Sequence, residues 1–89
     1  MPGHTPGMLA VAVQSRKGLA VVASDCAHPR ANFEADIPSC LFTDLPAMLT
    51  SMARLRQKAG GDLARLFPGH DPKLLSDYPK LAQDVTILA

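Results

Sequence analysis

Three side chains that lie far apart in the sequence have the chemistry of a metal site. His4 and His70 each offer an imidazole nitrogen, and Asp25 offers a carboxylate. Neutral imidazoles and carboxylates suit zinc and similar divalent ions, and one carboxylate can bridge two ions roughly 3.5–4 Å apart. We therefore predict that His4, Asp25 and His70 are metal ligands and that Asp25 is the bridge.

Each of these side chains, and each of their neighbours, also has an ordinary structural explanation. Surface histidines are often only solvated, and aspartates often cap or turn the chain. Asp71 either orients the ring of His70 or starts an Asp-Pro turn. His28 either lines a substrate pocket or is a solvated loop residue. Cys26, next to Asp25, is predicted to be a small buried apolar residue.

A β-hairpin is expected to carry two of the candidate ligands. Residues 8–14 and 19–24 are almost wholly apolar, and the polar residues 15–18 separate them. Because both runs are continuous rather than alternating, we expect both strands to be covered on both faces. His4 precedes the first strand on a loop rich in proline and glycine, and Asp25 directly follows the second strand.

The apolar residues of segment 45–59 recur at helical spacing. Thr43 or Asp44 can cap this helix, Pro46 suits its first turn, and Gly60-Gly61 ends it. The segment before it, residues 29–43, has no sustained period, so we expect an irregular connection there with a turn around residues 32–34.

The rest of the chain predicts short elements around the second histidine. A strand over residues 63–67 leads into the turn that contains His70. A short helix over residues 73–78 and a last strand over residues 85–88 complete the expected α/β fold.

Composition limits the classes of function. With 89 residues the chain is one domain at most, and its net charge of +1 is dispersed, so we expect neither a nucleic-acid partner nor an anionic membrane. No apolar stretch approaches the roughly 20 residues of a membrane helix, and no signal pattern is evident, which predicts a cytoplasmic protein with two reduced thiols, Cys26 and Cys40.

Three segments together resemble the last three metal motifs of the metallo-β-lactamase superfamily. They are Pro2-Gly3-His4-Thr5-Pro6-Gly7, Ser24-Asp25, and Pro68-Gly69-His70-Asp71-Pro72. The resemblance implies that residues 1–89 form the C-terminal half of an αβ/βα sandwich. It also implies a site for two zinc ions, with His4 and His70 on separate ions and Asp25 between them, and hydrolysis of a small lactone or ester by a metal-bound hydroxide.

The N-acyl homoserine lactonase-like branch of that superfamily is the most similar. Its pattern is matched by Asp25-Cys26-Ala27-His28, by Asn32-Phe33-Glu34, and by Gly69-His70-Asp71-Pro72 ahead of Tyr78-Pro79. Lactonases of this branch can carry a tyrosine three residues after the bridging aspartate, and this chain has His28 there.

The superfamily's His-x-His-x-Asp-His motif, which supplies most of the other ligands, is absent from the 89 residues. We therefore expect that the N-terminal half of the domain is missing and that the isolated chain is inactive, because three shared ligands cannot fill two sites. The alternative is a non-catalytic remnant or subunit that associates with another chain, or with itself, through an exposed sheet face.

Overall fold

Strand β2 lies at the centre of a three-stranded sheet. In the computed structural model, which describes residues 1–88, β2 (Gly18–Ser24) pairs antiparallel with β1 (Val11–Ser15) and parallel with β3 (Leu66–Pro68). The first two strands form the predicted hairpin, with β1 starting three residues later than expected. Gly18 closes the turn at φ 111°, a conformation that other residues rarely adopt.

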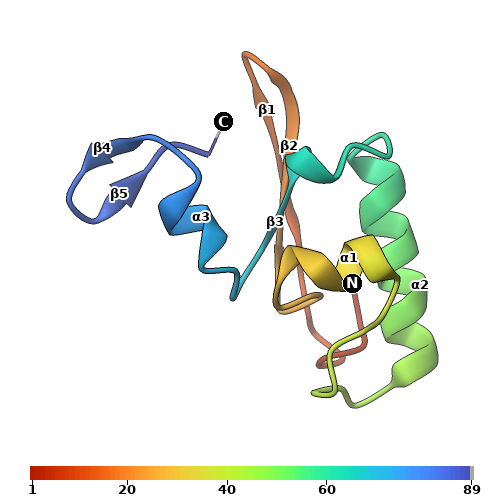
Figure 1. Ribbon diagram of the computed structural model, residues 1–89. Helices are drawn as coiled ribbons and strands as arrows, with labels where there is room; N and C mark the ends of the chain where they lie inside the picture. Colours follow the sequence, from red (N-terminus) through yellow and green to blue (C-terminus); the bar gives the residue numbers. More distant parts are fainter. Residues whose placement is uncertain (89) are drawn as a thin grey trace.

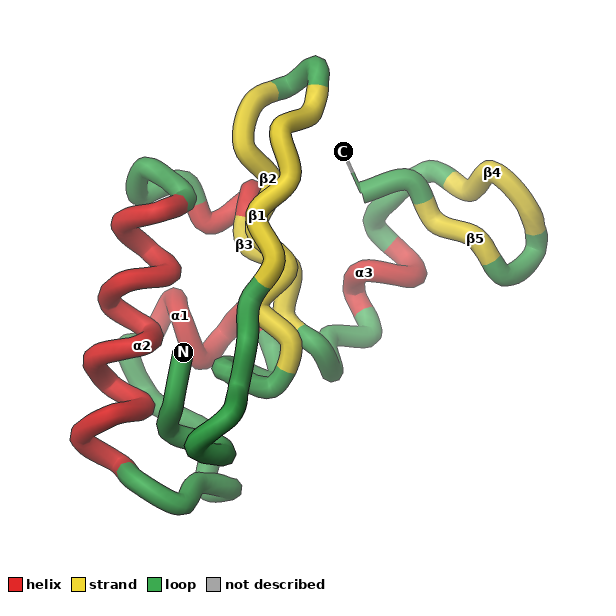
Figure 2. The backbone as a smooth tube through the Cα atoms, turned by 180° about the vertical axis from the view of Figure 1, so that it is seen from behind, coloured by secondary structure: helices red, strands yellow, loops and turns green. Residues whose placement is uncertain are grey.

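Two helices cover one face of this sheet. Helix α1 (Arg30–Ala35) and helix α2 (Leu45–Lys58) lie together on the same side of β2 and β3 in both views (Figures 1 and 2). The buried side chains between helices and sheet form one hydrophobic core: Val21, Ala23, Cys26, Ala27, Phe33, Met48, Met52, Leu55, Ala59 and Leu66.

Helix α2 confirms the prediction made from its periodicity. The Asp44 carboxylate accepts a hydrogen bond from the backbone N–H of Ala47 at 2.9 Å, which identifies Asp44 as the N-cap. Beyond the C-terminus of the helix, Gly60 and Gly61 have φ angles of 67° and 78°. Glycine adopts these left-handed conformations readily, so the two glycines end the helix. Within the described part of the chain no helix is both long and apolar enough to cross a bilayer.

The expectation of an irregular connection over residues 29–43 was wrong at its start, where α1 forms a helix of six residues. Phe33 of this helix is fully buried in the core, and the guanidinium of Arg56 in α2 binds the Phe33 carbonyl and lies 3.2 Å from the Asp36 carboxylate. A single buried side chain leaves no period in the sequence. Helix α1 is held by contacts with distant parts of the chain, among them those of Arg56 and the hydrogen bond from the Arg30 N–H to Asp71.

The expectation that both hairpin strands are covered on both faces was wrong for β1. Val11 and Val13 are 58% and 50% exposed, and Val22 of β2 is 41% exposed. Strand β1 is an edge strand. The C-terminal elements, α3 (Lys73–Ser76), β4 (Lys80–Ala82) and β5 (Val85–Thr86), lie apart from it on the side opposite α2 (Figure 1). The described residues therefore leave an apolar sheet face open.

The C-terminal elements are shorter than predicted. The expected strand over 63–67 begins as a 3₁₀ turn, η1 (Leu63–Arg65), because Asp62 caps it by accepting from the Ala64 N–H at 3.0 Å. Helix α3 (Lys73–Ser76) follows β3. Strand β4 (Lys80–Ala82), which the sequence did not predict, pairs with β5 (Val85–Thr86), and Ala89 lies outside the described residues.

Two leucines of α2 provide a matched test of the core. Leu55 is fully buried and Leu49 is 43% exposed. Leu55→Ala should lower the free energy of unfolding by about 2–5 kcal/mol, because it removes buried methyl groups and leaves a cavity, whereas Leu49→Ala should cost about 1 kcal/mol or less. Urea denaturation followed by circular dichroism measures both, and equal losses would contradict this core.

Candidate metal centre

The parallel pairing of β2 with β3 brings Asp25 and His70 together. Ser24 at the end of β2 is in register with Pro68 at the end of β3, and the Gly69 N–H donates to the Ser24 carbonyl at 2.9 Å. The residues that follow the two strands are thus held at one edge of the sheet. His70 Nε2 lies 3.0 Å from Asp25 Oδ1.

The end of β2 is distorted just before Asp25. The register of β2 and β3 shifts between Val22 and Ser24, and Ser24 has a positive φ of 50°. Such irregularities redirect the following side chain, and a non-glycine residue in this conformation is often found at a functional site. Here the redirected side chain is the Asp25 carboxylate.

His4 reaches the same carboxylate from the N-terminal loop. The Gly3 carbonyl accepts hydrogen bonds from the N–H groups of Thr43 and Asp44, at 2.7 and 3.1 Å, which fasten this loop to the start of α2. His4 Nδ1 lies 2.8 Å from the Leu41 carbonyl oxygen. A carbonyl can only accept, so Nδ1 carries the hydrogen, and Nε2, 3.7 Å from Asp25 Oδ2, is free to bind a metal.

The structure adds His28 to the group. Its ring lies between the other two, with centroid distances of 5.7 Å to His4 and 5.0 Å to His70. Asp25, His28 and His70 each offer a ligand atom, all within 4.8 Å of one another, so these three residues could hold a metal ion. From the sequence, His28 was either a pocket residue or a solvated loop residue. Its position three residues after Asp25 was the available signal of its place near the site.

The donor set and its spacing fit a divalent ion. Two ligands at about 2.0–2.2 Å from a tetrahedral zinc are about 3.3–3.5 Å apart, and the separations of Asp25 from His70 and His4, 3.0 and 3.7 Å, lie on either side of that value. The side chains of His4, Asp25 and His70 are 23%, 31% and 65% exposed. An ion and a small molecule can therefore reach them.

Asp71 makes its contacts with the backbone. Its two carboxylate oxygens accept from the N–H groups of Arg30 and Lys73, at 2.9 and 3.0 Å, so it fastens the His70 loop to the start of α1. Among the described residues no hydrogen bond joins Asp71 to the ring of His70. Its predicted role beside the metal site stays a prediction.

Cys26 packs in the hydrophobic core and is not part of the group of candidate ligands. Burial raises the pKa of the Cys26 thiol above its ordinary value, against the opposing effect of the N-terminal ammonium, and the Asp25 carboxylate raises it further. The thiol therefore stays protonated at neutral pH, which agrees with its prediction as a small apolar residue of the core. Cys26 and the exposed Cys40 are both free.

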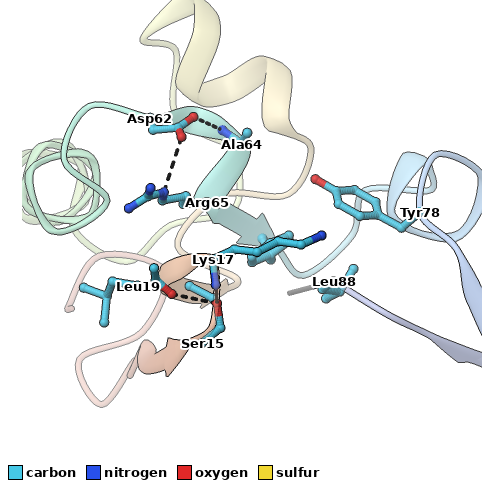
Figure 3. Close-up of a pocket in the computed structure, with 11 residues that line it drawn as sticks. Ser15, Lys17, Leu19, Asp62, Ala64, Arg65, Tyr78 and Leu88 are labelled. Carbon is cyan, nitrogen blue, oxygen red and sulfur yellow. Dashed lines mark hydrogen bonds and ion pairs between the residues drawn. The ribbon is translucent and has the colours of Figure 1, made fainter.

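Two hollows of the surface are lined by residues of β3 or of the segment that follows it. One of about 270 Å³ is bounded by the hairpin and Arg65 on one side and by Tyr78 and Leu88 on the other (Figure 3). It is lined by none of the four site residues, because it lies at the Gly18 end of β2, roughly 20 Å of strand from Asp25. A shallower hollow of about 380 Å³ adjoins the site and is lined by His70, Asp71, Leu74 and Leu75, among others.

The chain is similar to two known bacterial enzymes. It matches N-acyl homoserine lactonases from Bacillus cereus and from another Bacillus isolate, each at 32% identity over 71 residues. The match includes 79% of this chain and 28% of each relative, so the chain spans less than a third of the relatives' length. No family model matches the chain.

These sequence matches relate the chain to the metallo-β-lactamase superfamily, to which the lactonases belong. Within that superfamily it is a distant homologue of the N-acyl homoserine lactonases, over a part of their length. The resemblance stated from the sequence is thereby confirmed.

Two glycines test how the N-terminal loop positions His4. A Cβ on Gly3, which has φ 142°, would lie 2.4 Å from the Met48 Cα, whereas a Cβ on Gly7 would meet nothing within 4 Å. Gly3→Ala should therefore destabilise the fold by about 1–3 kcal/mol, because the loop must move off α2. Gly7→Ala should change stability by about 1 kcal/mol or less. Urea denaturation compares them, and a neutral Gly3→Ala would refute the close packing of this loop.

Proposed function

We propose that this chain is a segment of a metal-dependent hydrolase that cleaves a lactone or a similar ester. The observation that carries the proposal is the convergence of His4, Asp25 and His70 at one edge of the sheet, in a chain homologous to lactonases. In this proposal residues 1–89 are part of a metallo-β-lactamase-fold domain, and the remaining ligands of a two-ion site come from outside these residues.

The three side chains have distinct tasks in this proposal. Asp25 directs Oδ1 toward His70 and Oδ2 toward His4, so it would bridge two ions, each of which also takes one histidine. Divalent ions bound there supply Lewis-acid activation of a water molecule and of the acyl carbonyl. The backbone contacts of Gly3 and Gly69 fix the ligands before an ion arrives.

The surface beside His70 favours an acyl substrate. The shallow hollow that His70 lines is otherwise largely apolar, with Leu74 and the 62% exposed Leu75 in its wall. An acyl chain could lie on these leucines while its carbonyl faces the metal site. His28 stands where related lactonases can carry a tyrosine, so the polar group next to the site is an imidazole in this chain.

A segment exchange tests the proposed activity. The matched 71-residue segment of the Bacillus cereus lactonase is replaced by the corresponding segment of this chain, and hydrolysis of an N-acyl homoserine lactone is measured with zinc present. We expect turnover above the uncatalysed rate. Asp25→Asn in the exchanged protein should lower the turnover by at least about 100-fold. Loss of a residue that only supports a metal ligand costs about 10–100-fold, and the loss of a ligand should cost at least as much.

Two controls make the segment exchange decisive. Circular dichroism and zinc content establish that the exchanged protein folds and binds metal. Asp44→Asn changes a carboxylate that caps α2 instead of facing the histidines, and should leave turnover within a few fold. A folded, zinc-loaded protein that is inactive would refute the proposed hydrolysis.

A second candidate function is supported by a separate observation. Val11, Val13 and Val22 form an exposed apolar face on the hairpin, and such a face favours association with another chain or with a second copy. A remnant or subunit of this kind needs no metal. It gains support if the exchanged protein folds without binding zinc.

A further inference from the structure

We infer that His28, Asp25 and His70 together form a one-ion site, so that this chain binds a single divalent ion without a protein ligand from outside residues 1–89. The inference deepens the proposed function, because it concerns the same site. It differs from the sequence-based expectation, in which His28 was either a pocket residue or a solvated loop residue and three ligands were shared between two incomplete sites.

The ligand group around Asp25 contains His28 and His70 but not His4. His70 Nε2 lies 3.0 Å from Asp25 Oδ1, and one ligand atom each of Asp25, His28 and His70 lie within 4.8 Å of one another. His4 is outside this group, with its Nε2 3.7 Å from Asp25 Oδ2. Two imidazoles and a carboxylate are one of the protein ligand sets of catalytic zinc, which keeps its fourth position open.

The backbone holds His28 in place for this task. Its carbonyl accepts from the His70 N–H at 3.1 Å, so the two histidine residues are joined directly. Its own N–H donates to the Asn32 side-chain oxygen at 3.1 Å, at the start of α1. The loops that carry the ligands are therefore fixed without a metal, and little ordering is needed when an ion binds.

Ser39 orients the His28 ring. Its hydroxyl lies 2.9 Å from His28 Nδ1 and also accepts from the Leu41 N–H at 3.2 Å, and Ser39 is buried. Because Nδ1 faces Ser39, Nε2 is the nitrogen left for a metal. An ion on Nε2 selects the form in which Nδ1 donates its hydrogen to Ser39, which makes Ser39 a positioning residue of the kind that supports metal-bound histidines.

Equilibrium dialysis of the 89-residue chain against zinc, and against cobalt(II) with its visible spectrum, tests the inference. We expect one ion per chain. His28→Ala should weaken binding by at least about 100-fold, and Ser39→Ala by about 10-fold with recovery in Ser39→Thr, because outer partners contribute about 10–100-fold. His4→Ala should weaken binding less than His28→Ala, because His4 lies outside the group of three ligand atoms. Cys40→Ser, which removes an exposed thiol, is the matched control.

Imidazole ¹⁵N NMR of the unsubstituted chain gives the same answer without a variant. Zinc should shift Nε2 of His28 and His70 and leave Nε2 of His4 in place. Unchanged His28 signals, or a loss of affinity in His4→Ala as large as in His28→Ala, would overturn the inference. Neither readout depends on hydrolysis. If the chain binds one ion but the exchanged protein is inactive, the proposed activity is refuted and the one-ion site stands.

Discussion

The arrangement of the candidate site depends on one short parallel pairing, that of β2 with β3. The hydrogen bond from the Gly69 N–H to the Ser24 carbonyl, 2.9 Å long, holds the ends of the two strands together, and Asp25 and His70 follow directly. The contact is so close that a Cβ on Gly69 would lie 2.9 Å from Asp25 Oδ1. Without this pairing nothing would hold the Asp25 carboxylate next to the His70 imidazole.

The core on the helical face supports this pairing. Val21 and Leu66, which face each other across β2 and β3, are both buried against α2. The same helix receives the Gly3 loop at its N-terminus and so also positions His4. One face of the sheet therefore provides stability, while the sheet edge carries the chemistry and the opposite face stays open on the hairpin.

Features that are local in the sequence were predictable. The helix over 45–59 follows from its period and its Asp44 cap, and the hairpin follows from two apolar runs. Features that depend on distant contacts were not. Helix α1 contributes one buried residue to the core, Phe33. Val11, Val13 and Val22 are exposed because no other element of residues 1–88 covers this face of the hairpin, which the apolar sequence of the strands does not reveal.

The residues of the candidate site also fall into those that the local sequence predicted and those that it did not. His4, Asp25 and His70 could be named from the motifs around them, and the structure places both histidines beside the carboxylate. The place of His28 could not be named, because it depends on the backbone contact with His70 and on Ser39, eleven residues away. The local sequence Asp25-Cys26-Ala27-His28 contains no information on either contact.

X-ray absorption at the zinc edge of the metal-loaded chain tests the central claim, that imidazoles and the Asp25 carboxylate converge on one ion. The structure predicts nitrogen and oxygen neighbours at about 2.0–2.2 Å, with the outer-shell scattering of at least two imidazole rings. Sulfur neighbours at about 2.3 Å, or a spectrum without imidazole scattering, would contradict it.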